Sequence, residues 1–142
     1  MSFETTVLRR LAGQTGVPLV QLLDDADRRP PDLAAVGDPT TYADLCTPEG
    51  LARIDEYADG IGPRLALVLP RDADDNVTGP STLVRDAHRL WLTVHVWTLR
   101  RENRFLPANL RAPGGPATPA DLARVAPLPL PAGVDGLSTD YP

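Results

Sequence analysis

Two histidines, His88 and His95, are the side chains best suited to move protons near neutral pH. An acid/base pair of this kind would serve a hydrolytic reaction. His88, however, lies in a segment with helical apolar spacing, where we expect it to pack or to face solvent. His95 alternates with Trp97 in a β-rich segment, so we expect a hydrogen-bonded core histidine. We therefore assign no catalytic residue in this chain.

The densest carboxylate cluster places Asp72, Asp74 and Asn76 at alternate positions, as a calcium-binding loop does. Such a loop also needs glycine at the next position and a bidentate glutamate further on. Val77 and Leu83 stand at those positions. We expect a solvated turn here and assign no metal ligand.

The elements that must position these residues alternate between strands and helices along the chain. Threonine followed by proline, at Thr47-Pro48 and Thr118-Pro119, predicts two helix N-termini. In a third helix, one stripe is expected to hold Leu83, Val84, Ala87, His88 and Trp91. Periodicity predicts helices over 4–12, 48–58, 80–91 and 119–126, strands over 17–23, 59–65, 92–98 and 134–139, and long loops over 24–46, 67–79 and 99–117. This alternation predicts an α/β fold with parallel strands and right-handed crossovers.

Length and composition limit the number of domains and the kinds of partner that the chain can have. A chain of 142 residues suits one domain, whereas a complete eight-stranded α/β barrel needs about 250 residues. The net charge of −5 argues against nucleic acid or an anionic membrane as the main partner. The single cysteine, Cys46, excludes an internal disulfide. No apolar run approaches the roughly 20 residues of a membrane span, and no signal peptide is recognisable. We expect a cytoplasmic protein as written, and an extracytoplasmic one if the true N-terminus lies upstream.

Several segments resemble the glycerophosphodiester phosphodiesterase family. Its last two strands are similar to the stretch Val94-His-Val-Trp-Thr-Leu-Arg-Arg-Glu-Asn-Arg-Phe105 and to the segment Gly133–Pro142. Ser2-Phe3-Glu4, 17–23 and 57–63 match the family in the same order. The resemblance implies a partial TIM-type (β/α) barrel, from about strand 4 to strand 8. Residues 1–142 would then be the C-terminal part of a phosphodiesterase domain, lacking its first three strands.

The resemblance implies hydrolysis of glycerophosphodiesters to an alcohol and glycerol 3-phosphate, a reaction of lipid and glycerol metabolism. The family uses a divalent ion, calcium or magnesium, with histidine acid/base help. Its His-Arg-Gly, Glu-x-Asp and Glu-x-Lys motifs, which supply these groups, do not occur here. We expect a truncated phosphoric diester hydrolase with little or no activity alone and no divalent ion bound by this chain alone.

Four residues are candidates for substrate binding. By resemblance, Trp97 and Phe3 line the substrate pocket, although either ring could instead belong to the core. Gln21 is polar within a buried strand, so its amide either faces the substrate or bonds a neighbouring strand. Arg100 follows the Trp97 strand and could meet a phosphodiester with paired donors, unless its loop is solvated charge.

Two other interpretations stay open. The chain could be a non-catalytic half-barrel that serves as a binding or interaction module. Its open strand edges near Phe3 and Leu137 would then allow self-association. It could also be one part of a split enzyme that a second polypeptide completes.

Overall fold

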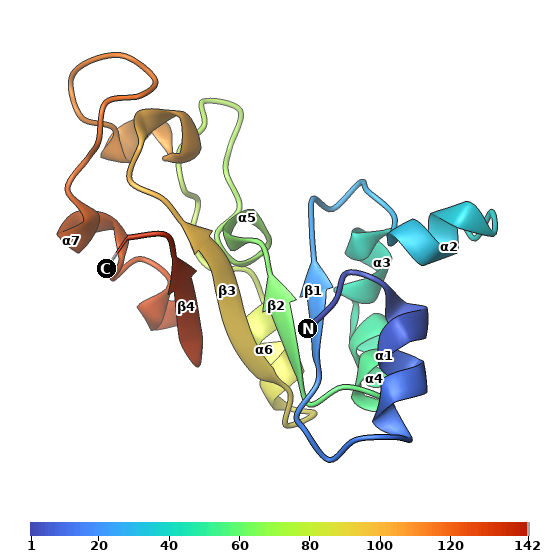
Figure 1. Cartoon of the computed structure of the whole chain (residues 1–142). Coiled ribbons are helices and arrows are strands. Elements are labelled where there is room, and N and C mark those ends of the chain that lie inside the picture. Colours follow the sequence, from blue (N-terminus) through green and yellow to red (C-terminus); the bar gives the residue numbers. More distant parts are fainter. Residues whose placement is uncertain (142) are drawn as a thin grey trace.

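Four parallel strands form one sheet whose spatial order follows the chain. The computed structural model describes residues 1–141, apart from the side chain of Leu122. The strands are β1 (Val20–Leu23), β2 (Gly60–Pro63), β3 (Thr93–Leu99) and β4 (Gly136–Thr139), as Figure 1 shows. Each strand pairs in parallel with the next. The expected α/β class with parallel strands alternating with helices is confirmed.

Helices connect the strands, but several predicted boundaries are wrong. The helices are α1 (Thr5–Ala12), α2 (Pro31–Ala35), α3 (Tyr42–Leu45), α4 (Pro48–Asp55), α5 (Leu65–Val68), α6 (Leu83–His88) and α7 (Leu122–Val125), with 3-10 turns η1 (Asn103–Phe105), η2 (Ala108–Leu110) and η3 (Leu130–Ala132). The segment 24–46, expected to be a loop, therefore contains α2 and α3. Among residues 1–141, no helix combines the length and apolar character that a membrane span needs.

Side-chain caps explain where two of these helices begin. The Thr47 hydroxyl accepts the Gly50 amide at 3.0 Å, which confirms the predicted start of α4. The corresponding prediction at Thr118 is wrong, because α7 begins only at Leu122. There the Asp121 carboxylate accepts the Ala123 amide at 2.9 Å. Asp121, three residues after Thr118, is therefore the side chain that caps the start of α7.

The apolar stripe predicted for the helix over 80–91, which is α6 in the structure, is also too long. Leu83, Val84 and Ala87 are buried as expected. The helix ends at His88, however, and Trp91 follows in a turn with φ of 62° and a side chain 92% exposed. Trp91 therefore points away from the core instead of continuing the stripe.

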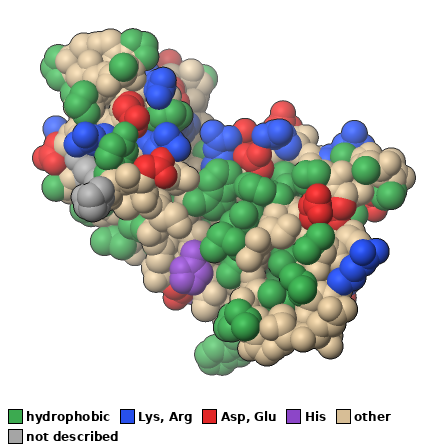
Figure 2. Space-filling model, in the orientation of Figure 1, with side chains coloured by type: hydrophobic (Ala, Val, Ile, Leu, Met, Phe, Trp, Pro, Cys, Tyr) green, Lys and Arg blue, Asp and Glu red, His purple; other side chains and the backbone are tan. Residues whose placement is uncertain are grey.

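The two faces of the sheet have different environments. On one face Leu23, Ile61, Val94 and Val96 are at most 1% exposed and belong to a core that includes residues of α4 and α6. Alternate residues of the same strands point the other way. On this second face, hereafter the open face, none of the described helices covers the sheet (Figure 1). Figure 2 shows hydrophobic side chains and a histidine on it.

Asp32 of α2 closes the first turn of α1. Its Oδ2 accepts the Thr6 amide at 2.7 Å and the hydroxyls of Thr5 at 3.0 Å and Thr6 at 2.5 Å. Burial alone would raise the pKa of Asp32, but the hydrogen bonds from both threonines outweigh it and lower the pKa. The carboxylate supplies from a distant segment the cap that Glu4 does not provide.

We expect Asp32→Ala to lower the free energy of unfolding by about 1 kcal/mol at pH 7. Because the folded-state pKa is depressed, this stability is present above the unfolded pKa and is lost as the pH falls through the folded value. Urea unfolding at pH 7 and pH 3 should show the difference between wild type and variant narrowing in acid. The exposed Asp27, changed to alanine, is the matched control. An equal difference at both pH values would contradict this role.

Candidate functional site at the carboxyl ends of the strands

An aromatic cluster lies at the carboxyl ends of the strands. The rings of Phe3 and Trp97 meet edge to face, with centroids 5.5 Å apart and an interplanar angle of 80°. Tyr42 contacts Phe3 at a centroid distance of 6.5 Å. The structure thus brings together two of the four predicted binding residues and adds a third ring. We call Phe3, Tyr42 and Trp97 the aromatic cluster.

Trp97 is held on the open face by its neighbour strand. Its indole Nε1 donates to the Gly62 carbonyl at 2.6 Å. Gly62 lies close to the Leu22 side chain, since a Cβ at this position would lie 2.5 Å from Leu22 Cδ2 and would require that side chain to shift. A half-buried indole with a satisfied N–H offers an apolar face to a ligand without leaving a buried donor unpaired.

Phe3 reaches Trp97 across two strands. Ser2 pairs in parallel with Gln21, so the start of the chain lies beside β1. Both β1 and β2 therefore separate the backbones of Phe3 and Trp97, which in a flat sheet would be roughly 14 Å apart. On the open face the two side chains extend toward each other over the intervening strands, so their rings meet.

Gln21 fixes the segment that carries Phe3. Its side chain is fully buried, and its Nε2 donates to the carbonyls of Phe3 at 3.1 Å, Leu22 at 3.0 Å and Ser2 at 3.3 Å. Its Oε1 accepts the Tyr57 hydroxyl at 3.0 Å. Of the two roles expected for Gln21, the bond to a neighbouring strand is the one that these contacts supply.

Charged side chains follow the strands directly and pair with one another. Arg64, after β2, donates from Nη1 to Asp25 at 2.5 Å and to Asp24 at 3.3 Å, and both aspartates follow β1. Arg28 also contacts Asp24, at 2.6 Å. Asp24 and Asp25 are thus compensated by arginines at this edge of the sheet.

Arg100, the fourth predicted binding residue, is engaged by the end of the chain. Its Nη2 lies 2.6 Å from Asp140 Oδ2, and its guanidinium lies 5.0 Å from the centroid of the Phe105 ring. Tyr141 likewise donates to Glu102 at 2.8 Å. The loop after β3 is therefore held to the residues after β4. An anion that binds Arg100 would compete with Asp140. Pro142, the last residue of the resembling segment, lies outside the described residues.

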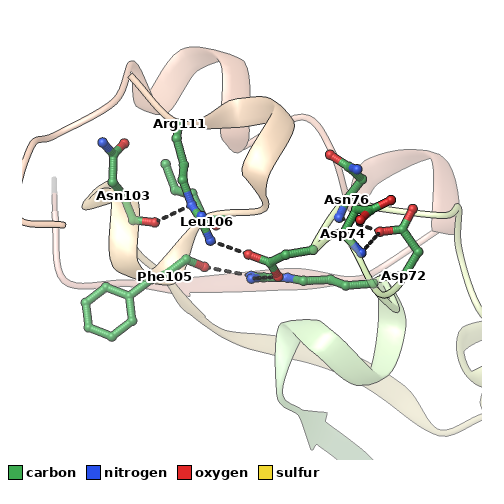
Figure 3. Close-up of polar contacts among 9 residues, drawn as sticks. Asp72, Asp74, Asn76, Asn103, Phe105, Leu106 and Arg111 are labelled. Atoms are coloured by element: carbon green, nitrogen blue, oxygen red, sulfur yellow. Dashed lines mark hydrogen bonds and ion pairs between the residues drawn. The ribbon is translucent and has the colours of Figure 1, made fainter. Parts of the chain in front are cut away.

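The predicted aspartate-rich turn is present and is tightly hydrogen bonded (Figure 3). Asp72 Oδ1 accepts the amides of Asp74 at 3.0 Å and Asn76 at 2.9 Å. Asp75, at φ of 63°, pairs with Arg71 at 2.9 Å and also with Arg111. The hydrogen bond from Arg71 lowers the pKa of Asp75, with a further contribution from Arg111.

Arg71 and Arg111 join the segment between α5 and α6, which follows β2 along the chain, to the segment after β3. Arg71 Nη2 donates to the Phe105 carbonyl at 2.7 Å. Arg111 Nε donates to the carbonyls of Asn103 at 3.1 Å and Leu106 at 3.0 Å (Figure 3). Asp75 bridges the two guanidiniums, so it couples the two loops as one unit.

We expect Asp75→Asn to lower the free energy of unfolding by about 1 kcal/mol, an effect that should shrink at high salt. Asparagine tolerates the left-handed backbone conformation, so the substitution removes the charge and leaves the turn. Thermal unfolding in low and high salt would measure this. Asp74→Asn is the matched control, because only the backbone of Asp74 bonds within the turn. Equal effects of the two substitutions would contradict the bridging role of Asp75.

The two histidines contact different residues. His88 Nε2 is 2.9 Å from Asp135 Oδ2 at the surface. His95 shares the open face with Trp97 and is exposed, and a Cβ at Gly136 would lie 2.5 Å from its Nδ1. The side-chain hydrogen bond expected for His95 is absent among the described residues. Neither histidine contacts the other in an acid/base pair.

A divalent ion needs several ligands around one point, and the carboxylates at the carboxyl ends of the strands are the candidates. Among the described residues, no group of three histidine, cysteine, aspartate or glutamate side chains is arranged to hold one. Asp24, Asp25 and Asp75 instead pair with arginines.

Tyr42 and Arg111 are site residues that were not predicted. Tyr42 falls in the segment expected to be loop, yet Thr41 and Asp44 around it form a capping box. That spacing was a usable signal for α3 and hence for the position of Tyr42. No local sequence pattern predicts the role of Arg111. Its ion-pair partner Asp75 lies between α5 and α6, and the carbonyls that it binds belong to Asn103 and Leu106.

A parallel sheet with aromatic and charged side chains gathered at the carboxyl ends of its strands defines an α/β protein of the kind that binds ligands at this edge. Residues 1–142 match the sequence model of the Glycerophosphoryl diester phosphodiesterase family. The chain belongs to this family, as its segments indicated.

A curated relative supports the same assignment. The chain is 33% identical over 142 residues to the glycerophosphodiester phosphodiesterase GDPD6 of Arabidopsis thaliana. The match covers 99% of this chain and 34% of that protein. The chain thus spans about a third of the length of this relative.

Proposed function

We propose that this chain is the C-terminal part of a phosphodiesterase barrel, from about strand 4 to strand 8, and that it forms the substrate-binding wall. Membership of the family supports a phosphodiesterase-type function. The parallel pairing of Ser2 with Gln21 adds a further strand position outside β1.

The observation that carries the proposal is the contact between Phe3 and Trp97 at the carboxyl ends of the strands. In this proposal the aromatic cluster holds the carbon atoms of a glycerophosphodiester on the open face. Gln21 acts as a positioning residue, because it fixes the backbone of Phe3. Arg100 meets the phosphodiester when the substrate displaces Asp140. No acid/base pair or metal group is assigned within the chain, so catalysis requires groups from outside residues 1–142.

The direct test is hydrolysis of glycerophosphocholine by the purified chain with calcium or magnesium, against an EDTA control. Size in solution is followed in parallel, so that aggregation is not mistaken for inactivity. We expect a folded protein with little or no turnover. Metal-dependent turnover that His95→Ala abolishes would overturn the proposal, since the chain would then hold its own catalytic site.

Binding is tested separately from turnover. NMR saturation transfer from the protein to glycerophosphocholine should be detectable for the wild type and lost in Trp97→Ala. Trp91→Ala, which removes an indole 92% exposed in the turn before β3, at the opposite end of that strand from Trp97, should keep it. Transfer that survives in Trp97→Ala would exclude the aromatic cluster as the binding wall.

A further inference from the structure

The segment after β3 has a charge opposite to that of the whole chain. Residues 99–124 contain five arginines and only two carboxylates, in a protein whose net charge is −5. Figure 2 shows basic side chains, with a few acidic ones between them, over this part of the molecule. The overall balance hides this local excess, which attracts anions.

Only part of this charge is neutralised within the protein. Arg100 pairs with Asp140, and Arg111 pairs with Asp75. Arg104 forms no ion pair with the described residues. Its guanidinium lies 4.7 Å from the centroid of the Phe105 ring, an uncharged partner that orients it and leaves its charge available.

Arg104 and Arg111 line an open hollow of about 330 Å³, and the loop over 112–116 forms part of its wall. This volume lies at the lower end of the range for small-molecule sites, about 300–1,000 Å³. Among residues 1–141, no carboxylate lines the hollow. Arg111 is held in place by the carbonyls of Asn103 and Leu106, as Figure 3 shows, so its position does not depend on a ligand.

Asn103 builds the wall of the hollow. It is 4% exposed, donates to the carbonyls of Ala112 at 2.7 Å and Gly115 at 3.2 Å, and accepts the Ala112 amide at 2.8 Å. Arg104 N also donates to Pro116 O at 3.0 Å. These bonds preform the loop before any ligand arrives.

Two consecutive glycines complete the lining. Gly114 has φ of 136°, and a Cβ on it would lie 2.4 Å from Thr118 Oγ1, so this position requires glycine. The amides of Gly114 and Gly115 donate to no acceptor among the described residues. Successive free backbone amides beside guanidinium groups are a recurrent arrangement for phosphate-type anions.

We propose that this hollow binds a phosphate monoester or inorganic phosphate, through Arg104, Arg111 and the amides of Gly114 and Gly115. The site is separate from the aromatic cluster and does not depend on the proposed hydrolysis. Arg104 supplies the net positive charge, because Asp75 already compensates Arg111. The phosphate group could belong to a free anion or to a lipid headgroup.

The first arm of the test titrates inorganic phosphate into the labelled chain at constant ionic strength, set with chloride. We expect chemical-shift changes at the amides of Gly114 and Gly115, and roughly tenfold weaker binding in Arg104→Gln. Arg124→Gln is the matched control, since it removes one arginine of the same segment outside the hollow and should bind like the wild type. Circular dichroism checks that all three proteins are folded.

The second arm measures sedimentation with vesicles of phosphatidic acid in phosphatidylcholine. Binding that Arg104→Gln abolishes and Arg124→Gln keeps would support the site and identify a lipid headgroup as its source of phosphate. Phosphate shifts without vesicle binding would support a free anion. Absence of both effects, or equal losses in the two variants, would overturn the proposal.

Discussion

Replacing Gln21 with leucine should lower the free energy of unfolding by about 2–4 kcal/mol. Leucine fills a similar volume but removes every polar contact of the buried amide. The carbonyls of Ser2 and Phe3 lose a donor, and the buried Tyr57 hydroxyl loses its acceptor. The Phe3 carbonyl and the Tyr57 hydroxyl then carry a desolvation cost with no compensating hydrogen bond, whereas the Ser2 carbonyl keeps its bond from the Leu22 amide. Urea unfolding measures the loss.

Two further variants separate this effect from general sensitivity to substitution. Gln14→Leu makes the same chemical change at an exposed position and should be neutral within about 0.5 kcal/mol. Tyr57→Phe removes only the bond to Gln21 and should cost about 1 kcal/mol. A Gln21→Leu protein as stable as the wild type would show that the first residues are held by other contacts.

The order of strands and helices could be predicted from the sequence because it rests on local patterns. The apolar run over 17–23, which contains β1, is short and continuous, as buried parallel strands require. In β3 buried residues instead alternate with exposed ones over most of its length. Thr47 and Pro48 signalled a helix start through the threonine hydroxyl, which accepts the Gly50 amide, and the fixed φ of proline. The ends of elements were less accurate: α6 stops at His88, and Trp91 leaves the stripe that its spacing suggested.

Only part of the candidate site could be predicted from the sequence. Phe3 and Trp97 were predicted individually, but their contact depends on the order of the strands in the sheet, which no local pattern specifies. The bridge from Asp75 to Arg111 joins residues 36 positions apart, and a cluster of aspartates alone does not reveal its partners. Gln21 was recognised as a buried polar residue in need of partners, and its partners came from three segments of the chain.

Trp97→Ala should cost about 2–3 kcal/mol of unfolding free energy and should also loosen the first residues of the chain. The substitution removes the edge-to-face contact with Phe3 and the hydrogen bond to Gly62. Near-ultraviolet circular dichroism should lose the aromatic signal that a fixed Phe3–Trp97 geometry produces. Hydrogen exchange at the Leu22 amide, which donates to the Ser2 carbonyl, should become faster.

Trp91→Ala is the matched control, because it removes the same side chain from a position 92% exposed. It should change stability by no more than about 0.5 kcal/mol and leave exchange at Leu22 unchanged. The double variant of Gln21→Leu with Trp97→Ala should lose less than the sum of the single losses, since both act on the segment that carries Phe3. Strict additivity would mean that Gln21 and Trp97 stabilise the chain independently, and the aromatic cluster would then not depend on the buried amide for its position.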